Sequence, residues 1–235
     1  MPDRCAALLS PRENDKNFLL SRRGQCHDPH MYPGERFNSI SHLIGAALAL
    51  AALVVLVVFA SLQGDPWKIV SFSIYGTTLF LLYTLSTLYH SLRGRAKLIF
   101  QKLDHAAIYL LIAGSYTPFT LVTLRGVWGW SLFGVVWCLA IIGIVIDYQH
   151  RNGPRIYQII IYLLMGWVIL VALYPLIQNL PTGGLVWLVI GGLCYTGGMV
   201  FYALDEKLNH AHGIWHLFVL AGSVSHFLAI LLYVL

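Results

Sequence analysis

The stretch SISHLIGAALALAALVVLVVFASL, residues Ser39–Leu62, decides the fold class of this chain because it contains no Asp, Glu, Lys or Arg. A helix needs roughly 20 apolar residues to cross a bilayer, and this stretch is long enough. Six further apolar runs follow, separated by short polar breaks, all but the last of which contain glycine or proline. The predicted spans are Ser39–Leu62, Ile69–His90, Asp104–Thr123, Trp128–Ile146, Ile156–Ile177, Leu185–Leu204 and Gly213–Leu235. The sequence therefore predicts an all-α membrane protein, a bundle of seven transmembrane helices.

The composition of the whole chain agrees with this prediction. Of its 235 residues, 58% are hydrophobic and 11% are charged, whereas an ordinary soluble domain has about 25% charged residues. Seven spans leave no room for a separate folded soluble domain. We therefore expect a polar tail over residues 1–34 and a membrane domain over residues 35–235. The tail lacks the apolar segment of a signal peptide, and Met31 is an alternative start of the protein.

Positive charges indicate how the bundle is oriented. If the N-terminus is cytoplasmic, ten Lys and Arg residues lie in or beside the inner loops, and only Lys68 and Arg125 lie in the outer loops. Cytoplasmic loops of membrane proteins usually contain more Lys and Arg than the loops on the other side of the membrane. We therefore expect a cytoplasmic N-terminus and an external C-terminus. The net charge of +5 follows from this sidedness, and we expect no nucleic-acid partner.

A few ionisable side chains fall inside the predicted spans, where each costs about 2.5–3.5 kcal/mol and needs a partner or a function. His212 and His216 are four residues apart, so both lie on one face of the last helix, about 5.4 Å apart along its axis. His90 ends the second span, which runs antiparallel to the last and reaches the same depth. Three imidazoles can thus converge on one cation. Alternatively, the HxxxH pair faces only headgroups or water.

Three neutral histidines suit Zn²⁺ and leave its fourth tetrahedral position open to water. Asp104, at the start of the third predicted span, could accept a proton from that water or orient a histidine. Ser86, one turn before His90, could add a hydrogen bond to the water or to a ligand carbonyl group. We therefore predict His90, His212 and His216 as Zn²⁺ ligands and Asp104 and Ser86 as catalytic residues.

Other polar residues of the spans have structural interpretations. Asn38 and His42 share a helix face and are expected to hydrogen-bond between helices. Glu35 is expected to pair with a neighbouring arginine or with lipid headgroups. His226 lies about 21 Å beyond His212 along the helix axis, too far to reach the same cation, and is expected to line the core or a cavity.

The chain resembles the hemolysin III family, the bacterial branch of the progestin and adipoQ receptor superfamily, in four segments. These are ERFNSISHLIG (Glu35–Gly45), STLYHS (Ser86–Ser91), KLDHAAIYLLIAGSYTPF (Lys102–Phe119) and HGIWHLFVLAGSVSHF (His212–Phe227). The resemblance implies a multi-pass protein of the bacterial inner membrane with a zinc ion in the cytoplasmic half of the bilayer. It carries the ligand role onto His90, His212 and His216, with Asp104 and Ser86 around the metal-bound water.

Three functions are compatible with these predictions. The first is hydrolysis of a lipid amide or ester bond, because the adiponectin receptors of the same superfamily resemble ceramidase-like enzymes. The second is a non-enzymatic sensor or regulator of membrane state with a structural zinc ion. The third is cytolysis, which the family name suggests but which the lack of a long amphipathic insertion segment disfavours. We expect a role in membrane lipid homeostasis with membrane lipids as partners; the sequence indicates no protein partner and leaves the oligomeric state open.

Overall fold

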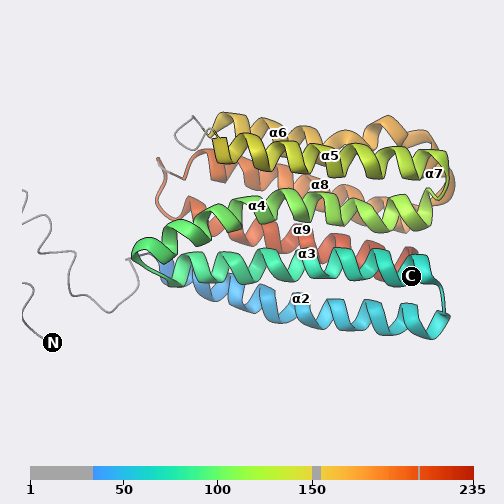
Figure 1. Cartoon of the computed structure of the whole chain (residues 1–235), viewed down its shortest axis with the longest axis horizontal. Coiled ribbons are helices and arrows are strands. Elements are labelled where there is room, and N and C mark those ends of the chain that lie inside the picture. Colours follow the sequence, from blue (N-terminus) through green and yellow to red (C-terminus); the bar gives the residue numbers. More distant parts are fainter. Residues whose placement is uncertain (1–33, 150–154, 206) are drawn as a thin grey trace, which may run out of the picture. The chain divides into compact units, whose positions relative to one another are not determined.

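The computed structural model describes residues 34–149, 155–205 and 207–235, which are almost entirely helical and contain no strand (Figure 1). Seven helical segments among them are long and apolar enough to cross a membrane. The elements are α2 (Glu35–Gln63), α3 (Pro66–Ser91), α4 (Gly94–Pro118), η3 (Phe119–Thr123), α5 (Val127–Gln149), α6 (Ile156–Trp167), η4 (Val168–Ala172), α7 (Leu173–Asn179), α8 (Thr182–Ala203) and α9 (Ala211–Tyr233). The predicted all-α bundle of seven spans is confirmed. Apart from Gly34, the predicted tail and Met31 lie outside the described residues.

The helices run side by side with alternating direction, as Figure 1 shows. α2 packs on α3, α3 on α4 and α8 on α9, while α9 also contacts α2. One end of the bundle, which we call the histidine end, is where α2, α4, α6 and α9 begin and where α3, α5 and α8 finish. Because α3 ends and α9 begins there, residues far apart in the sequence meet at this end.

Small residues let the helices that carry the site approach closely. A Cβ atom at Gly213, near the start of α9, would lie 2.8 Å from Cδ1 of Phe37 on α2. A Cβ atom at Gly45 on α2 would lie 2.6 Å from the ring of Tyr83 on α3. Larger side chains at these positions would push α9 and α3 away from α2.

One helix boundary differs clearly from the prediction. α4 begins at Gly94, well before the predicted start at Asp104. The added turns contain Arg95, Lys97 and Lys102, whose long side chains have good helix propensity but low hydropathy. A search for apolar runs finds the membrane-length core of a helix and misses such charged extensions.

Two of the spans depart from α-helical geometry. Pro118 is followed at once by the π-helical segment η3, as expected where a proline removes a backbone hydrogen bond. A second distortion, the 3₁₀ segment η4 between α6 and α7, was not predicted. Pro175 lies just beyond it, and a proline ring displaces the carbonyl group four residues earlier. The hydroxyl group of Tyr116 donates to the backbone oxygen of Gly166 (2.8 Å) and accepts from the amide of Ile169 (3.0 Å), which satisfies backbone groups at the break.

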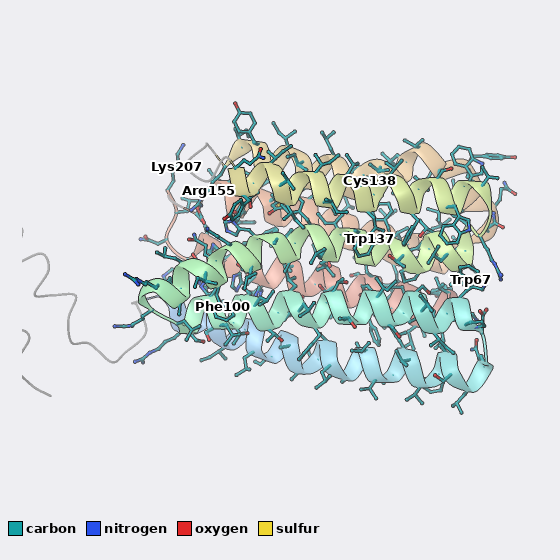
Figure 2. The ribbon with its side chains drawn as sticks, in the orientation of Figure 1. Trp67, Phe100, Trp137, Cys138, Arg155 and Lys207 are labelled. Carbon is teal, nitrogen blue, oxygen red and sulfur yellow. The ribbon has the colours of Figure 1, made fainter. Side chains whose placement is uncertain are left out.

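The outer surface of the bundle is apolar along its length and polar at its ends. Exposed large side chains on α2 alone include Ile40, Leu43 and Leu48. In Figure 2, Arg155 and Lys207 lie at the histidine end and Trp67 lies at the opposite end. Such a surface is suited to lipid, because an exposed apolar area of this extent is unfavourable in water.

Candidate metal centre

Three histidines from two helices meet at the histidine end of the bundle. His90 comes from the last turn of α3, and His212 and His216 come from the first two turns of α9. One nitrogen from each ring lies within 4.8 Å of the other two, and the three residues could hold a metal ion. The Nε2 atoms of His90 and His212 are 3.3 Å apart. His90 and His216 are buried, and His212 is half-buried.

Each of these rings makes a hydrogen bond through Nδ1 to an oxygen atom. The three bonds join His90 to the carboxylate of Glu35, His212 to Asp205 Oδ2 (3.1 Å) and His216 to the backbone oxygen of Asn38 (3.3 Å). Carboxylate and carbonyl oxygens can only accept hydrogen bonds, so these contacts favour Nδ1 as the donor in His90 and His212. In His216 the same atom also lies 3.3 Å from the hydroxyl group of Ser41, which can donate to it. A neutral imidazole that donates from Nδ1 keeps a lone pair on Nε2. The arrangement therefore directs the Nε2 atoms of His90 and His212 at each other, with one nitrogen of His216 within 4.8 Å of the ligand atoms of both.

The separation of His90 and His212 fits a metal ion. Two ring nitrogens 3.3 Å apart are joined either by a proton that one of them donates or by a metal ion that both bind, because two lone pairs alone would repel. Tetrahedral Zn²⁺ with Zn–N distances of about 2.0–2.1 Å places two ligand nitrogens about 3.3–3.4 Å apart, which matches the observed distance. The hydrogen bonds to Nδ1 are also the usual second contacts of metal-bound histidines. The residues present thus fit a divalent metal ion.

The structure places Asp104 and Ser86 beside the three histidines. Both line the same cavity as His90, His212 and His216. The carboxyl group of Asp104 interacts with Ser86 and with His212. The hydroxyl group of Ser86 is buried and has no hydrogen-bond partner of normal geometry among the described residues. A polar atom in this position is available to a bound molecule.

Two acidic residues of the site were not predicted from the sequence. Glu35 was expected to pair with a neighbouring arginine or with headgroups; this prediction was wrong, because its carboxylate accepts from His90 and from Lys97 Nζ (2.9 Å). Asp205, in the loop between α8 and α9, accepts from His212 and from Arg155. Burial alone would raise the pKa of Asp205, but these contacts outweigh it and lower the pKa. Both carboxylates are therefore suited to remain charged beside a cation.

His42 also has a different environment from the one predicted. Its ring stacks on the ring of His216, with centroids 3.6 Å apart and planes 15° from parallel, and meets Tyr83 edge-on at 5.0 Å. Neither of its buried nitrogens has a hydrogen-bond partner among the described residues, so the hydrogen bond to another helix that was expected of His42 is absent there. His42 instead supports one face of a predicted metal ligand.

A cavity of about 640 Å³ extends from the three histidines into the bundle. Its deeper walls carry mainly apolar side chains, including Leu111, Ile112 and Met199. His226 also lines it, about 21 Å beyond His212 along α9. The expectation that His226 lines the core or a cavity is confirmed. The volume is typical of a site for a small organic molecule, and the shape suits an extended apolar chain.

Residues 31–227 match a protein family described as Haemolysin-III related. The chain belongs to this family. It is 47% identical over 199 residues to Hemolysin-3 of Bacillus cereus, covering 84% of this chain and 90% of that protein. It is 43% identical over 197 residues to a Hemolysin-3 homolog of Bacillus subtilis (strain 168), covering 83% and 92%. Identity to the human monocyte to macrophage differentiation factor is 30% over 191 residues, which are 79% of each chain.

These matches confirm the resemblance predicted from the four motif segments. Together with the seven apolar helices, they identify the haemolysin-III-related chain as a multi-pass membrane protein. The matched region includes the three histidines, the two carboxylates that accept from them, and the pair Asp104 and Ser86. The whole candidate site is thus part of the region shared with the family.

Proposed function

We propose that this haemolysin-III-related protein binds Zn²⁺ through His90, His212 and His216 and hydrolyses an amide or ester bond of a membrane lipid. Its role would be in lipid homeostasis of the bacterial inner membrane. The observation that carries the proposal is the pair of Nε2 atoms of His90 and His212, 3.3 Å apart, at the mouth of a cavity of about 640 Å³. Zinc, when bound by three imidazoles, polarises a carbonyl group and makes water more acidic.

The protein's own residues would prepare the ligands. Glu35 and Asp205 hold the Nδ1 protons of His90 and His212, so the Nε2 lone pairs stay directed at the ion. The two negative charges also favour a cation over an empty site. Lys97 and Arg155, which contact these carboxylates, fix their orientation.

Asp104 and Ser86 would carry out the proton transfer and the positioning of the substrate. A carboxylate beside the reacting carbonyl group can accept the proton of the attacking water and return it to the departing amine or alcohol. The hydroxyl group of Ser86, which interacts with the carboxyl group of Asp104, would turn to donate a hydrogen bond to the carbonyl oxygen when substrate is bound. The acyl chain would occupy the apolar part of the cavity, where bulk water is excluded.

The distribution of charge supports a cytoplasmic position for this site. Among the described residues, the histidine end carries most of the Lys and Arg side chains of the loops and helix ends, whereas the opposite end carries Lys68 and Arg125. Cytoplasmic ends of membrane helices are enriched in Lys and Arg. We therefore infer that the histidine end faces the cytoplasm.

A non-enzymatic role is the second candidate, and a specific observation favours it. The three histidines join α3 to α9, and their acceptors add α2 and the loop before α9. A metal ion there would fasten these elements and contribute to stability, as a sensor or regulator of membrane state would need. Cytolysis, suggested by the names of the Bacillus relatives, has no support in the described residues beyond those names.

The test compares the purified wild-type protein with Asp104→Asn and His212→Ala. We expect one zinc per chain in the wild type and in Asp104→Asn, and little in His212→Ala. Release of fatty acid from a panel of ceramides and phospholipids should occur only with the wild type. Zinc in the wild type without release of fatty acid, together with an unchanged lipidome in a deletion strain, would reject the hydrolase and leave the structural role. Absence of zinc would reject both.

A further inference from the structure

The deep end of the cavity contains a histidine with unused hydrogen-bonding capacity. His226 on α9 is only 9% exposed, and neither of its ring nitrogens has a hydrogen-bond partner among the described residues. The backbone oxygen of Leu188 interacts with the ring, but one carbonyl oxygen can accept from one nitrogen only, so at least one ring nitrogen has no partner there. His226 lines both the main cavity and a second, smaller cavity of about 90 Å³. The ring therefore lies where the two spaces adjoin.

Packing, and not hydrogen bonding, holds the ring of His226 in position. On one side the ring lies against the bare backbone of Gly191 on α8, where a Cβ atom would overlap it. On another side it meets the ring of Tyr195 edge-on, with centroids 5.3 Å apart. A ring fixed in this way, with its nitrogens unpaired, is pre-organised for a partner that is not part of the chain.

The other polar side chains around the deep end already have partners. These hydrogen bonds join Ser115 to the oxygen of Ile112 (2.8 Å), Tyr116 to the oxygen of Gly166 (2.8 Å), Trp167 to Thr196 (3.1 Å) and Tyr195 to Ser223 (2.9 Å). Within the described lining of this region, His226 is thus the side chain whose polar atoms remain unsatisfied. A buried polar group left without a partner is unfavourable.

We propose that His226 binds an oxygen-bearing substituent, a hydroxyl or keto group, on the chain of a single-chain lipid whose head lies at the three histidines. This inference rests on the proposed function only in taking the cavity as a lipid site, and it does not require hydrolysis. It makes His226 a specificity residue that distinguishes oxygenated chains from plain ones.

The cavity is lined both by the three histidines and by His226, which are separated by an axial distance of about 21 Å along α9. A chain that extends from the three histidines along this distance passes His226. The smaller cavity beyond the ring is lined mainly by apolar side chains, including Leu173, Leu176 and Leu188. The substituent therefore lies part-way along the chain, with an apolar end beyond it.

A hydroxyl group matches the free atoms of His226 better than any hydrocarbon does. A neutral imidazole offers one donor and one acceptor nitrogen. A hydroxyl group can satisfy either nitrogen, a keto group can accept from the donor, and a methylene group can do neither. A site built around a hydrogen bond rejects a ligand that lacks the matching group, because its own polar atom is then left unpaired.

The experiment measures binding of octadecanoic acid and of octadecanoic acids with one hydroxyl or keto group at successive positions. Zinc-loaded wild-type protein is compared with His226→Leu, which removes the hydrogen bonds, and with His226→Gln, which retains them. We expect hydroxyl groups in one narrow range of positions to tighten binding roughly three- to tenfold. The gain over octadecanoic acid should disappear in His226→Leu and persist in part in His226→Gln. Thermal melting and zinc content confirm that each variant is folded.

The outcomes separate this inference from the proposed function. Equal binding of plain and oxygenated chains by the wild type would overturn the role of His226, and so would a gain that persists in His226→Leu; both leave the lipid site intact. Failure of every chain to bind would overturn the lipid site and this inference together. A gain from the keto series alone would retain the role of His226 and assign the bound group as a carbonyl.

Discussion

Glu35 gives the sharpest test of how the site holds a metal ion. Its carboxylate accepts from His90 Nδ1 and from Lys97 Nζ and is 20% exposed. Glu35→Gln keeps the shape but removes the charge, and it cannot accept from both partners through two oxygens. Loss of one hydrogen bond to a charged group costs about 1.5–3 kcal/mol, which corresponds to a roughly 10- to 100-fold weaker affinity. Loss of a carboxylate that supports a metal-bound histidine has the same typical effect.

The affinity is measured by titrating the purified protein with zinc in competition with a chelator. Asp147→Asn is the matched control, because it removes the same charge from a carboxylate that contacts Gln158 and His105 and no predicted ligand. Its zinc affinity should stay within about twofold of the wild type. If Glu35→Gln binds zinc as tightly as the wild type, or if Asp147→Asn loses as much, the carboxylate does not act through His90.

Three further predictions concern stability and can be measured by thermal melting in detergent. Gly45→Ala should destabilise the bundle by about 1–3 kcal/mol, because the new Cβ atom would lie 2.6 Å from the ring of Tyr83; an unchanged melting temperature would show that the ring moves freely. A chelator should lower the stability of the wild type by about 2.7 kcal/mol if free zinc had been 100 times its Kd, and it should not affect His212→Ala. Tyr116→Phe should lower the free energy of unfolding by about 1–3 kcal/mol, because the phenylalanine leaves two backbone groups at the break after α6 without their hydroxyl partner. An unchanged stability would mean that these backbone groups find other partners.

The sequence was sufficient to predict the parts of the site that depend on helical periodicity. His212 and His216 share a helix face because they are four residues apart, and the antiparallel order of the spans brings His90 to the same depth. Glu35 and Asp205 could not be predicted in this way. Glu35 is 55 positions from His90 along the chain, and Asp205 lies in a loop that has no periodic pattern. Such contacts depend on how the helices are rotated against each other, which apolar runs do not specify.

The fold shows the same division between what a local pattern specifies and what packing decides. Apolar runs identified all seven spans, since a spanning helix needs a minimum apolar length. They missed the start of α4, where charged residues continue the helix. They also missed the break at η4, because Ile156–Ile177 is almost entirely apolar and a membrane helix can contain a proline without being interrupted.

His90 and His212, whose Nε2 atoms face each other, are 122 positions apart in the chain. During synthesis, α3 is complete long before α9 has been translated. Until then His90 is a lone imidazole, and the chain lacks the other two nitrogens that the metal site requires. An ion can thus be captured only after the last span has entered the bilayer. The metal content of the isolated protein would then report the fraction of molecules that completed insertion, because partly inserted or truncated chains would contain no ion.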